Sequence, residues 1–174
     1  MKSSRLFFLL ALFVLAAAVS WFVFSQSHRS AIGERITVYY TKLDGTTEVP
    51  WTISLRPQAG GESAAERLHN AALYAAVQAI AGPSSTIDAI RFPPGTQVRS
   101  LNVNGSTADV DLSGEVRSQG GGSLGESGEF KALVWTLTAL PGIDAVAIRI
   151  EGERVDTLPG GHLALDTPLR RSDW

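Results

Sequence analysis

The chain contains no cysteine among its 174 residues. This absence excludes a disulfide framework, a thiolate metal site and a lipid attached through a cysteine side chain. An excess of one charge is lacking as well, because the formal net charge is −2 and both signs are scattered along the chain. The chain therefore carries no electrostatic footprint for nucleic acid, and we expect no nucleic-acid partner.

Catalytic and cofactor motifs are also missing. His28, His69 and His162 stand alone, without the H-x-x-x-H or H-x-x-E-H spacing that brings zinc ligands together. No serine lies in a G-x-S-x-G elbow, and no G-x-x-x-x-G-K-[ST] phosphate loop occurs. We therefore predict no catalytic residue, no cofactor and no metal site, and we predict that the protein is not an enzyme.

One long apolar run is present near the start of the chain. Residues 6–24 are apolar except for Ser20, and they approach the length of about 20 residues that a membrane-spanning helix requires. Lys2 and Arg5 precede the run, which favours an N-terminus kept in the cytoplasm. We predict a cytoplasmic stretch at 1–5, a transmembrane signal anchor at 6–24, a linker at 25–33 and one domain at 34–174, on the extracytoplasmic side of the cell membrane.

A cleaved signal peptide is the alternative, with Ala16, Ala17 and Ala18 as the small-residue cleavage site. Cleavage there would leave Trp21 and Phe22 in an exposed apolar tail at the start of the mature protein. We therefore favour the uncleaved anchor.

The remaining chain alternates between two periodicities. Period-two alternation predicts strands at 35–40, 49–53, 98–104, 108–112 and 146–150. Helical spacing predicts one helix from the capping box Ser63–Glu66 to about Ala81, and a second that ends at Pro141-Gly142. This order predicts an α+β fold, a small mixed sheet of three to five strands with two helices packed on one face, preceded by a single N-terminal transmembrane helix.

The central hairpin has the clearest local signal. Asn104-Gly105 lies between two alternating runs, and we predict a type I′ turn with positive φ at both positions. The alternation places five apolar residues on the buried face: Leu101, Val103, Ala108, Val110 and Leu112. Asp109 and Asp111 then share the opposite face.

Two pairs of carboxylates could carry chemistry. Asp109 and Asp111 share one strand face, and Glu126 and Glu129 are three residues apart. Such pairs can transfer protons or hold a hard cation. The alternative is a solvated sheet face and acids placed favourably near a helix N-terminus, and we favour it because isolated surface carboxylates are common.

A glycine-rich loop at 114–128 leads into the second helix. Its backbone amides could hold an anion, or a partner could order it. We favour the partner and predict a contact surface at Gly120, Gly121, Gly122, Ser123, Glu126 and Glu129.

Short segments in a fixed order resemble the GerM-type sporulation and germination domain, written GerMN. They are 36–40 (ITVYY), Leu73, 81–83 (AGP), 92–96 (FPPGT), 103–112 (VNGSTADVDL), 121–123 (GGS), 133–138 (LVWTLT), 141–142 (PG) and 146–152 (VAIRIEG). The resemblance implies a small extracytoplasmic module with two helices on a sheet, similar to the ring-building domains of secretion-type assemblies. The resemblance further implies that, in spore formers, such a domain belongs to a protein needed for sporulation and germination and associated with a channel complex at the forespore envelope. The family has no assigned catalytic residues. Its namesake has two such domains and a lipid-modified cysteine, whereas this chain has one predicted domain and no cysteine.

Two functions follow from these observations. The first is a membrane-anchored interaction module that assembles with itself or with other proteins of the bacterial cell envelope, with a role in sporulation or germination as a further implication of the resemblance. The second is a domain that binds cell-wall glycan or a small molecule through the loop at 114–128 and the aromatic residues Tyr39, Tyr40 and Trp51. An enzyme ranks third.

Overall fold

The computed structural model describes residues 32–58, 60–84, 86–118, 122–159 and 161–174. The predicted cytoplasmic stretch, the anchor at 6–24 and most of the linker lie outside these residues. Among the described residues, no helix combines the length and the apolar character that crossing a membrane requires.

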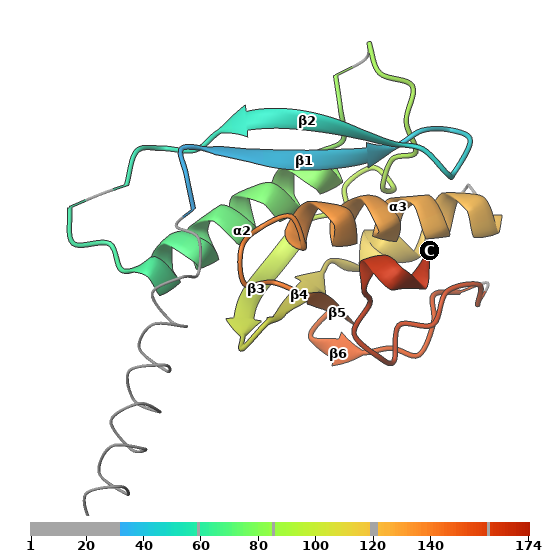
Figure 1. Ribbon diagram of the computed structural model, residues 1–174. Coiled ribbons are helices and arrows are strands. Elements are labelled where there is room, and N and C mark those ends of the chain that lie inside the picture. The colour runs from blue at the N-terminus through green and yellow to red at the C-terminus, as the bar shows by residue number, and fades with distance from the viewer. Residues whose placement is uncertain (1–31, 59, 85, 119–121, 160) are drawn as a thin grey trace, which may run out of the picture. The chain divides into compact units, whose positions relative to one another are not determined.

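Residues 32–174 form one unit built in three layers (Figure 1). The longer elements are β1 (Arg35–Thr41), β2 (Glu48–Ser54), α2 (Ala64–Ala81), β3 (Val98–Asn104), β4 (Thr107–Leu112), α3 (Gly122–Leu137) and β5 (Ala145–Ile150). The shorter ones are η1 (Gly114–Arg117), β6 (Glu153–Arg154) and η2 (Arg171–Asp173). Helices α2 and α3 lie between the β1–β2 hairpin and a sheet of order β3-β4-β5-β6.

The four-stranded sheet is mixed, because β4 and β5 run parallel while the other neighbours are antiparallel. Two helices on one face of a small mixed sheet are thus confirmed. The prediction of a single sheet was wrong, because β1 and β2 form a separate two-stranded sheet on the other side of the helices. Alternation identifies a strand, but it does not tell which sheet the strand joins.

Helix α3 explains why a second sheet is needed. Its apolar residues Phe130, Leu133, Val134 and Leu137 are fully buried, and the polar Thr136 is buried too. A helix that is buried on most of its circumference requires cover on more than one side. The four-stranded sheet covers one side and the β1–β2 hairpin covers another.

The hairpin is fixed to α3 through the free edge of β1. The amide of Tyr39 donates to Thr136 Oγ1 at 2.8 Å, and the same hydroxyl donates to the carbonyl of Tyr39 at 3.4 Å. The Thr41 hydroxyl donates to the carbonyl of Gly128 at 2.8 Å, and the amide of Ile90 donates to the Thr41 carbonyl at 2.8 Å. The helix and a neighbouring loop therefore satisfy the outward backbone groups of Tyr39 and the carbonyl of Thr41, which β2 does not reach.

The turn of the central hairpin is shifted by one residue from its predicted place. Asn104 pairs with Thr107, so the two turn residues are Gly105 and Ser106. Gly105 has φ of 63°, whereas Asn104 and Ser106 are not among the residues with positive φ. A glycine with positive φ at the first turn position is typical of type II′ and not of the predicted type I′. The buried face is as predicted except that Val103 is only partly buried.

The capping box that opens α2 is confirmed. The side chain of Ser63 accepts from the amide of Glu66 at 3.2 Å, and the Glu66 carboxylate accepts from the amide of Ser63 at 2.8 Å. The helix ends at Gly82, whose φ of 76° suits glycine. Its buried side is lined by small residues, which are Ala71, Ala72, Ala75, Ala76 and Ala79. These alanines let α2 approach β1, β3 and α3 closely.

We predict that Thr136→Val destabilises the fold by about 1–3 kcal/mol. The change keeps the shape of the side chain but removes the hydroxyl, so that both edge groups of Tyr39 stay buried without a partner. The free energy of unfolding in urea measures this. Thr52→Val on the exposed part of β2 is the control and should stay within about 0.5 kcal/mol of the wild type. Equal stability of the two variants would show that Thr136 does not hold the hairpin.

Candidate interaction surface

The structure divides the predicted contact residues into two groups. Gly122 and Ser123 are exposed in the first turn of α3, while Gly120 and Gly121 lie outside the described residues. Glu126 and Glu129 are only 1% and 5% exposed. The prediction of a contact surface therefore fails for these two glutamates, because a side chain in the interior cannot meet a partner.

Two exposed leucines lie beside Gly122 and Ser123. Leu124 follows them in α3 and is 51% exposed, and Leu43 in the β1–β2 turn is 60% exposed. Figure 1 shows this turn next to the start of α3. Gly45 links the two segments, because any Cβ at this position would collide with the side chain of Leu124. We call Leu43, Gly45, Gly122, Ser123 and Leu124 the tip surface.

Several polar contacts hold the tip surface in place. Lys131 Nζ forms an ion pair with Glu48 Oε1 at 2.7 Å and donates to the carbonyl of Thr46 at 3.2 Å. Both charged side chains are only 9% exposed. Within the turn, Asp44 Oδ1 accepts from the amides of Thr46 and Thr47, which holds the pKa of Asp44 at about 2. The turn is thus ordered before any partner arrives, which lowers the entropic cost of binding.

Glu126 and Glu129 form a buried carboxyl pair behind the tip surface. Glu126 Oε1 accepts from the amide of Leu163 at 3.1 Å, so this carboxyl attaches the C-terminal segment to α3. Burial raises the pKa of Glu129 to about 8, and the nearby charge of Glu126 adds to the rise. Both residues therefore act on packing within the chain.

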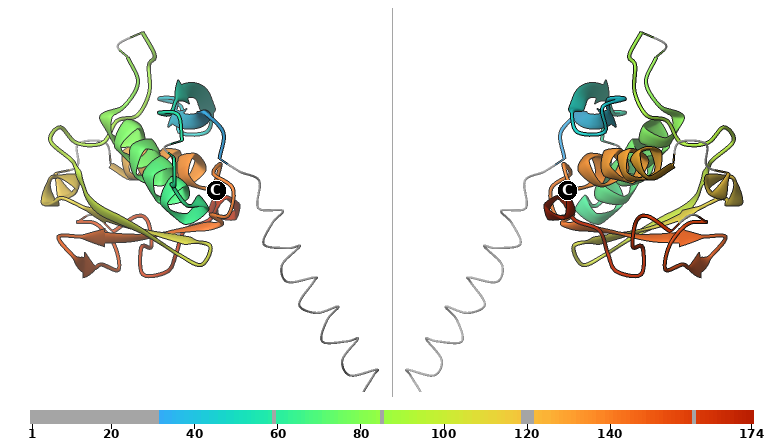
Figure 2. Two further views of the ribbon diagram at one scale, coloured as in Figure 1. Left: turned by 90° about the vertical axis from the view of Figure 1, so that its left-hand side faces the viewer. Right: turned by 90° about the vertical axis from the view of Figure 1, so that its right-hand side faces the viewer.

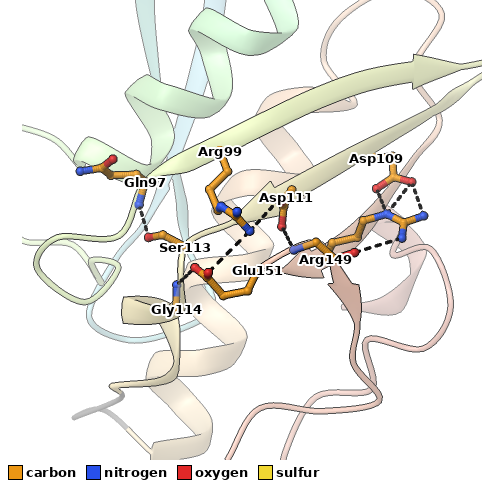
Figure 3. Close-up of polar contacts among 9 residues, drawn as sticks. Gln97, Arg99, Asp109, Asp111, Ser113, Gly114, Arg149 and Glu151 are labelled. Carbon is orange, nitrogen blue, oxygen red and sulfur yellow. Dashed lines mark hydrogen bonds and ion pairs between the residues drawn. The ribbon is translucent and has the colours of Figure 1, made fainter.

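The other predicted pair, Asp109 and Asp111, lies on the outer face of the four-stranded sheet (Figure 3). The guanidinium of Arg149 donates to both carboxylate oxygens of Asp109, at 2.8 Å from Nε and 3.1 Å from Nη2. Asp111 accepts from the amide of Gly152 at 2.8 Å and pairs with Arg99 at 3.3 Å. These contacts join neighbouring strands and the turn after β5. They give the pair a structural role, but the expected solvated face is wrong for Asp111, which is only 8% exposed. Within the described residues no group of three potential metal ligands occurs.

The aromatic residues considered for ligand binding do not gather at one place. Tyr40 is buried at 5% exposure, and Trp51 is 50% exposed on β2. Tyr39 lies on the other face of β1, where its ring meets the edge of Trp135 at 5.7 Å between centroids. The guanidinium of Arg171 lies over both of these rings. Tyr39 is therefore part of a packing cluster that holds the C-terminal segment.

Sequence reasoning predicted contacts at Gly122 and Ser123 of the tip surface and did not include its leucines. Leu43 and Leu124 are single apolar residues in or next to turns, and such residues are common on any surface. The one signal that could have shown them is Asp44-Gly45, because a tight turn exposes the residue in front of it.

Comparisons with known proteins agree with this architecture. A family model described as Germane, sporulation and spore germination, matches residues 37–156. The first GerMN domain of the sporulation protein GerM from Bacillus subtilis is 25% identical with a TM-score of 0.60, and the alignment covers 80% of this chain and 98% of that domain.

The tandem GerMN domains of the same Bacillus subtilis protein are 23% identical with a TM-score of 0.60, and the match covers 80% of this chain. This chain spans about half of that tandem structure, with 46% covered. A search of curated proteins found no match.

We predict that Glu129→Gln removes a pH dependence of stability. The folded protein keeps the proton on Glu129 up to about pH 8, whereas the unfolded chain loses it near the ordinary pKa of 4.5. Between these values the unfolded state binds fewer protons, so that this group lowers the free energy of unfolding as the pH rises.

Urea unfolding of wild type and variant between pH 4.5 and pH 8 measures this effect. The wild type should lose stability relative to Glu129→Gln across this range. Glu66→Gln, at an exposed carboxyl whose pKa is lowered, keeps Glu129 and should lose stability with rising pH as the wild type does. Parallel curves for wild type and Glu129→Gln would contradict the prediction.

Proposed function

This chain belongs to the Germane family of sporulation and spore germination domains, and from this premise we propose that it acts as an extracytoplasmic assembly module of the bacterial cell envelope. In this proposal the apolar run at 6–24 anchors the chain in the cell membrane, and the domain binds other envelope proteins in a process of sporulation or germination. The apolar run itself and the preceding Lys2 and Arg5 support the anchor.

The main support for a binding role is the exposed apolar character of the tip surface. Leu43 and Leu124 are more than half exposed, lie on neighbouring segments and are held there by the Lys131–Glu48 ion pair. Covering an exposed leucine contributes about 1.5–3 kcal/mol at most to the free energy of binding. The glycines beside the two leucines also let the backbone of a partner approach closely. Gly122 and Ser123 retain their predicted role as contact residues in this proposal.

We predict that the double variant Leu43→Ser/Leu124→Ser loses partner binding but folds normally. Crosslinking of the full chain in its native envelope, followed by pull-down and mass spectrometry, should recover defined envelope proteins with the wild type. The double variant should recover at least about tenfold less of them, since tenfold corresponds to about 1.4 kcal/mol.

Val77→Ser is the matched control, because Val77 is a 42% exposed apolar residue on α2 outside the tip surface. It should recover the same proteins as the wild type. If the wild type recovers no protein above background but stays on purified cell-wall material, the domain binds a cell-wall ligand and the assembly role is wrong.

A further inference from the structure

Strand β2 has an edge that no other strand of the described residues covers. The amide of Leu55 donates to the Glu34 carbonyl at 2.7 Å, and the amide of Lys42 donates to the Thr47 carbonyl at 2.8 Å. Antiparallel pairing alternates, so the odd-numbered residues of β2 bond to β1. The backbone groups of Pro50, Thr52 and Ser54 therefore point away from β1. In Figures 1 and 2, β2 lies on the far side of β1 from α3.

This edge also has few of the features that usually prevent strand pairing. Proteins protect edges with charges, bulges, prolines or very short strands. The edge strand β3 has a bulge between Val98 and Ser100 that contains Arg99. Between Glu48 and Arg56, by contrast, β2 has no charged residue, and Pro50 is its one protective residue.

The side chains along β2 are more exposed than those of β1. Its burial alternates weakly, with Thr52 and Ser54 exposed and Ile53 partly buried. Trp51 is 50% exposed although it lies next to the fully buried Val38 in the register of the hairpin. A strand that presents half of a tryptophan and a row of free amides and carbonyls can accept another strand.

We propose that β2 pairs in antiparallel fashion with β2 of a second copy of this chain, with Thr52 on the two-fold axis. In this register Thr52 faces Thr52 of the second copy, and each donates its amide to the other's carbonyl. Ser54 faces Pro50 of the second copy and donates to its carbonyl. Two copies thus share four such hydrogen bonds, while the carbonyl of each Ser54 faces Pro50, which has no amide to donate.

The side chains of the segment 48–56 are complementary to themselves in this register. Trp51 of one copy lies opposite Ile53 of the other, and Val49 lies opposite Leu55, so that apolar residues meet. The exposed Arg56 lies opposite Glu48, whose side chain is only 9% exposed and is bound to Lys131 within its own chain, so that this pair adds no attraction between the copies. No like charges face each other, and cross-strand pairs of these kinds stabilise a sheet.

Two other registers are less favourable. A register centred on Pro50 places two residues without an amide donor opposite each other. A register centred on Trp51 places the carbonyl of Thr52, in the middle of the edge, opposite Pro50, which has no amide to donate. The segment 48–56 is complementary to itself, so the partner that fits this edge is a second copy of the chain. The two copies would be joined through an isologous two-fold contact.

This inference goes beyond the proposed function, because it names a second surface and its partner. The tip surface lies at the turn of the hairpin, whereas this contact uses the backbone edge of β2. A self-pairing edge and a partner-binding tip can therefore be tested separately.

The absence of cysteine allows a direct test with single-cysteine variants of the full chain in detergent micelles. With Thr52→Cys, the two Cα atoms should lie about 5.5 Å apart, which suits a disulfide. Ser54→Cys is the matched control on the same edge, since it is displaced from its own counterpart by four residues, about 14 Å. Under mild oxidation, Thr52→Cys should form covalent dimers at least about tenfold faster than Ser54→Cys.

A second variant tests the backbone hydrogen bonds. Ser54→Pro in the Thr52→Cys background removes the amides that bond to Pro50 of the other copy, and it should slow crosslinking severalfold. Proline is tolerated there within the hairpin, because the amide of Ser54 does not bond to β1 and Pro50 occupies an equivalent position.

Three results would overturn the proposal: equal crosslinking of the two cysteine variants, no dimer from either, or unchanged crosslinking in a folded Ser54→Pro variant. Should Ser54→Pro fail to fold in circular dichroism, the comparison of Thr52→Cys with Ser54→Cys decides alone. The pull-down experiment tests partner binding at the tip surface, and its outcome does not change the interpretation of the crosslinking between copies at β2.

Discussion

The contact of Thr136 with the edge of β1 is the interaction on which the arrangement of this domain depends. The Thr136 hydroxyl accepts from the amide of Tyr39 and donates to its carbonyl. It thereby forms the two backbone hydrogen bonds that a neighbouring strand would otherwise form at this position of β1. A two-stranded hairpin alone is marginally stable in water. Fixed to α3, the hairpin becomes a third layer that covers the helix from the side opposite the four-stranded sheet. The tip surface and the β2 edge both belong to this layer, so their positions follow from the same contact.

Burying α3 from both sides has an electrostatic consequence. Its buried polar residues have no route to solvent and must find partners inside the protein. Lys131 does so with Glu48 of β2, and Glu126 does so with the backbone of Leu163 in the C-terminal segment. Glu129 stays protonated at neutral pH because its pKa is raised to about 8. The polar residues of one helix thus tie together a hairpin and a C-terminal segment that are more than a hundred residues apart in the chain.

The contacts of these polar residues could not be predicted from the sequence, whereas features set by neighbouring residues could. The capping box of Ser63 and Glu66 and the stop at Gly82 depend on neighbours within the chain, and local spacing predicted them correctly. The turn at Gly105 was displaced by one residue, because Asn104 can serve either as a turn residue or as the last residue of a strand. Thr136, Lys131 and Glu126 look like surface residues of an amphipathic helix, since their partners Tyr39, Glu48 and Leu163 are distant in sequence. For the same reason the contact surface was predicted at Gly122 and Ser123 but was wrongly extended to Glu126 and Glu129.

The strand edges of the domain differ in how they are covered, and this difference makes β2 distinctive. Thr136 and the loop at Ile90 cover β1. The two-residue strand β6 pairs with one end of β5, and Leu169 exchanges backbone hydrogen bonds of 2.9 Å and 2.8 Å with Val146 at the other end. Leu169 lies beyond residue 156, where the family match ends, and it is buried at 4% exposure. The C-terminal segment therefore closes an edge of the four-stranded sheet. An added segment covers β5 and a bulge interrupts β3, whereas β2 is open and carries no charged residue between Glu48 and Arg56. This difference directs strand pairing to β2.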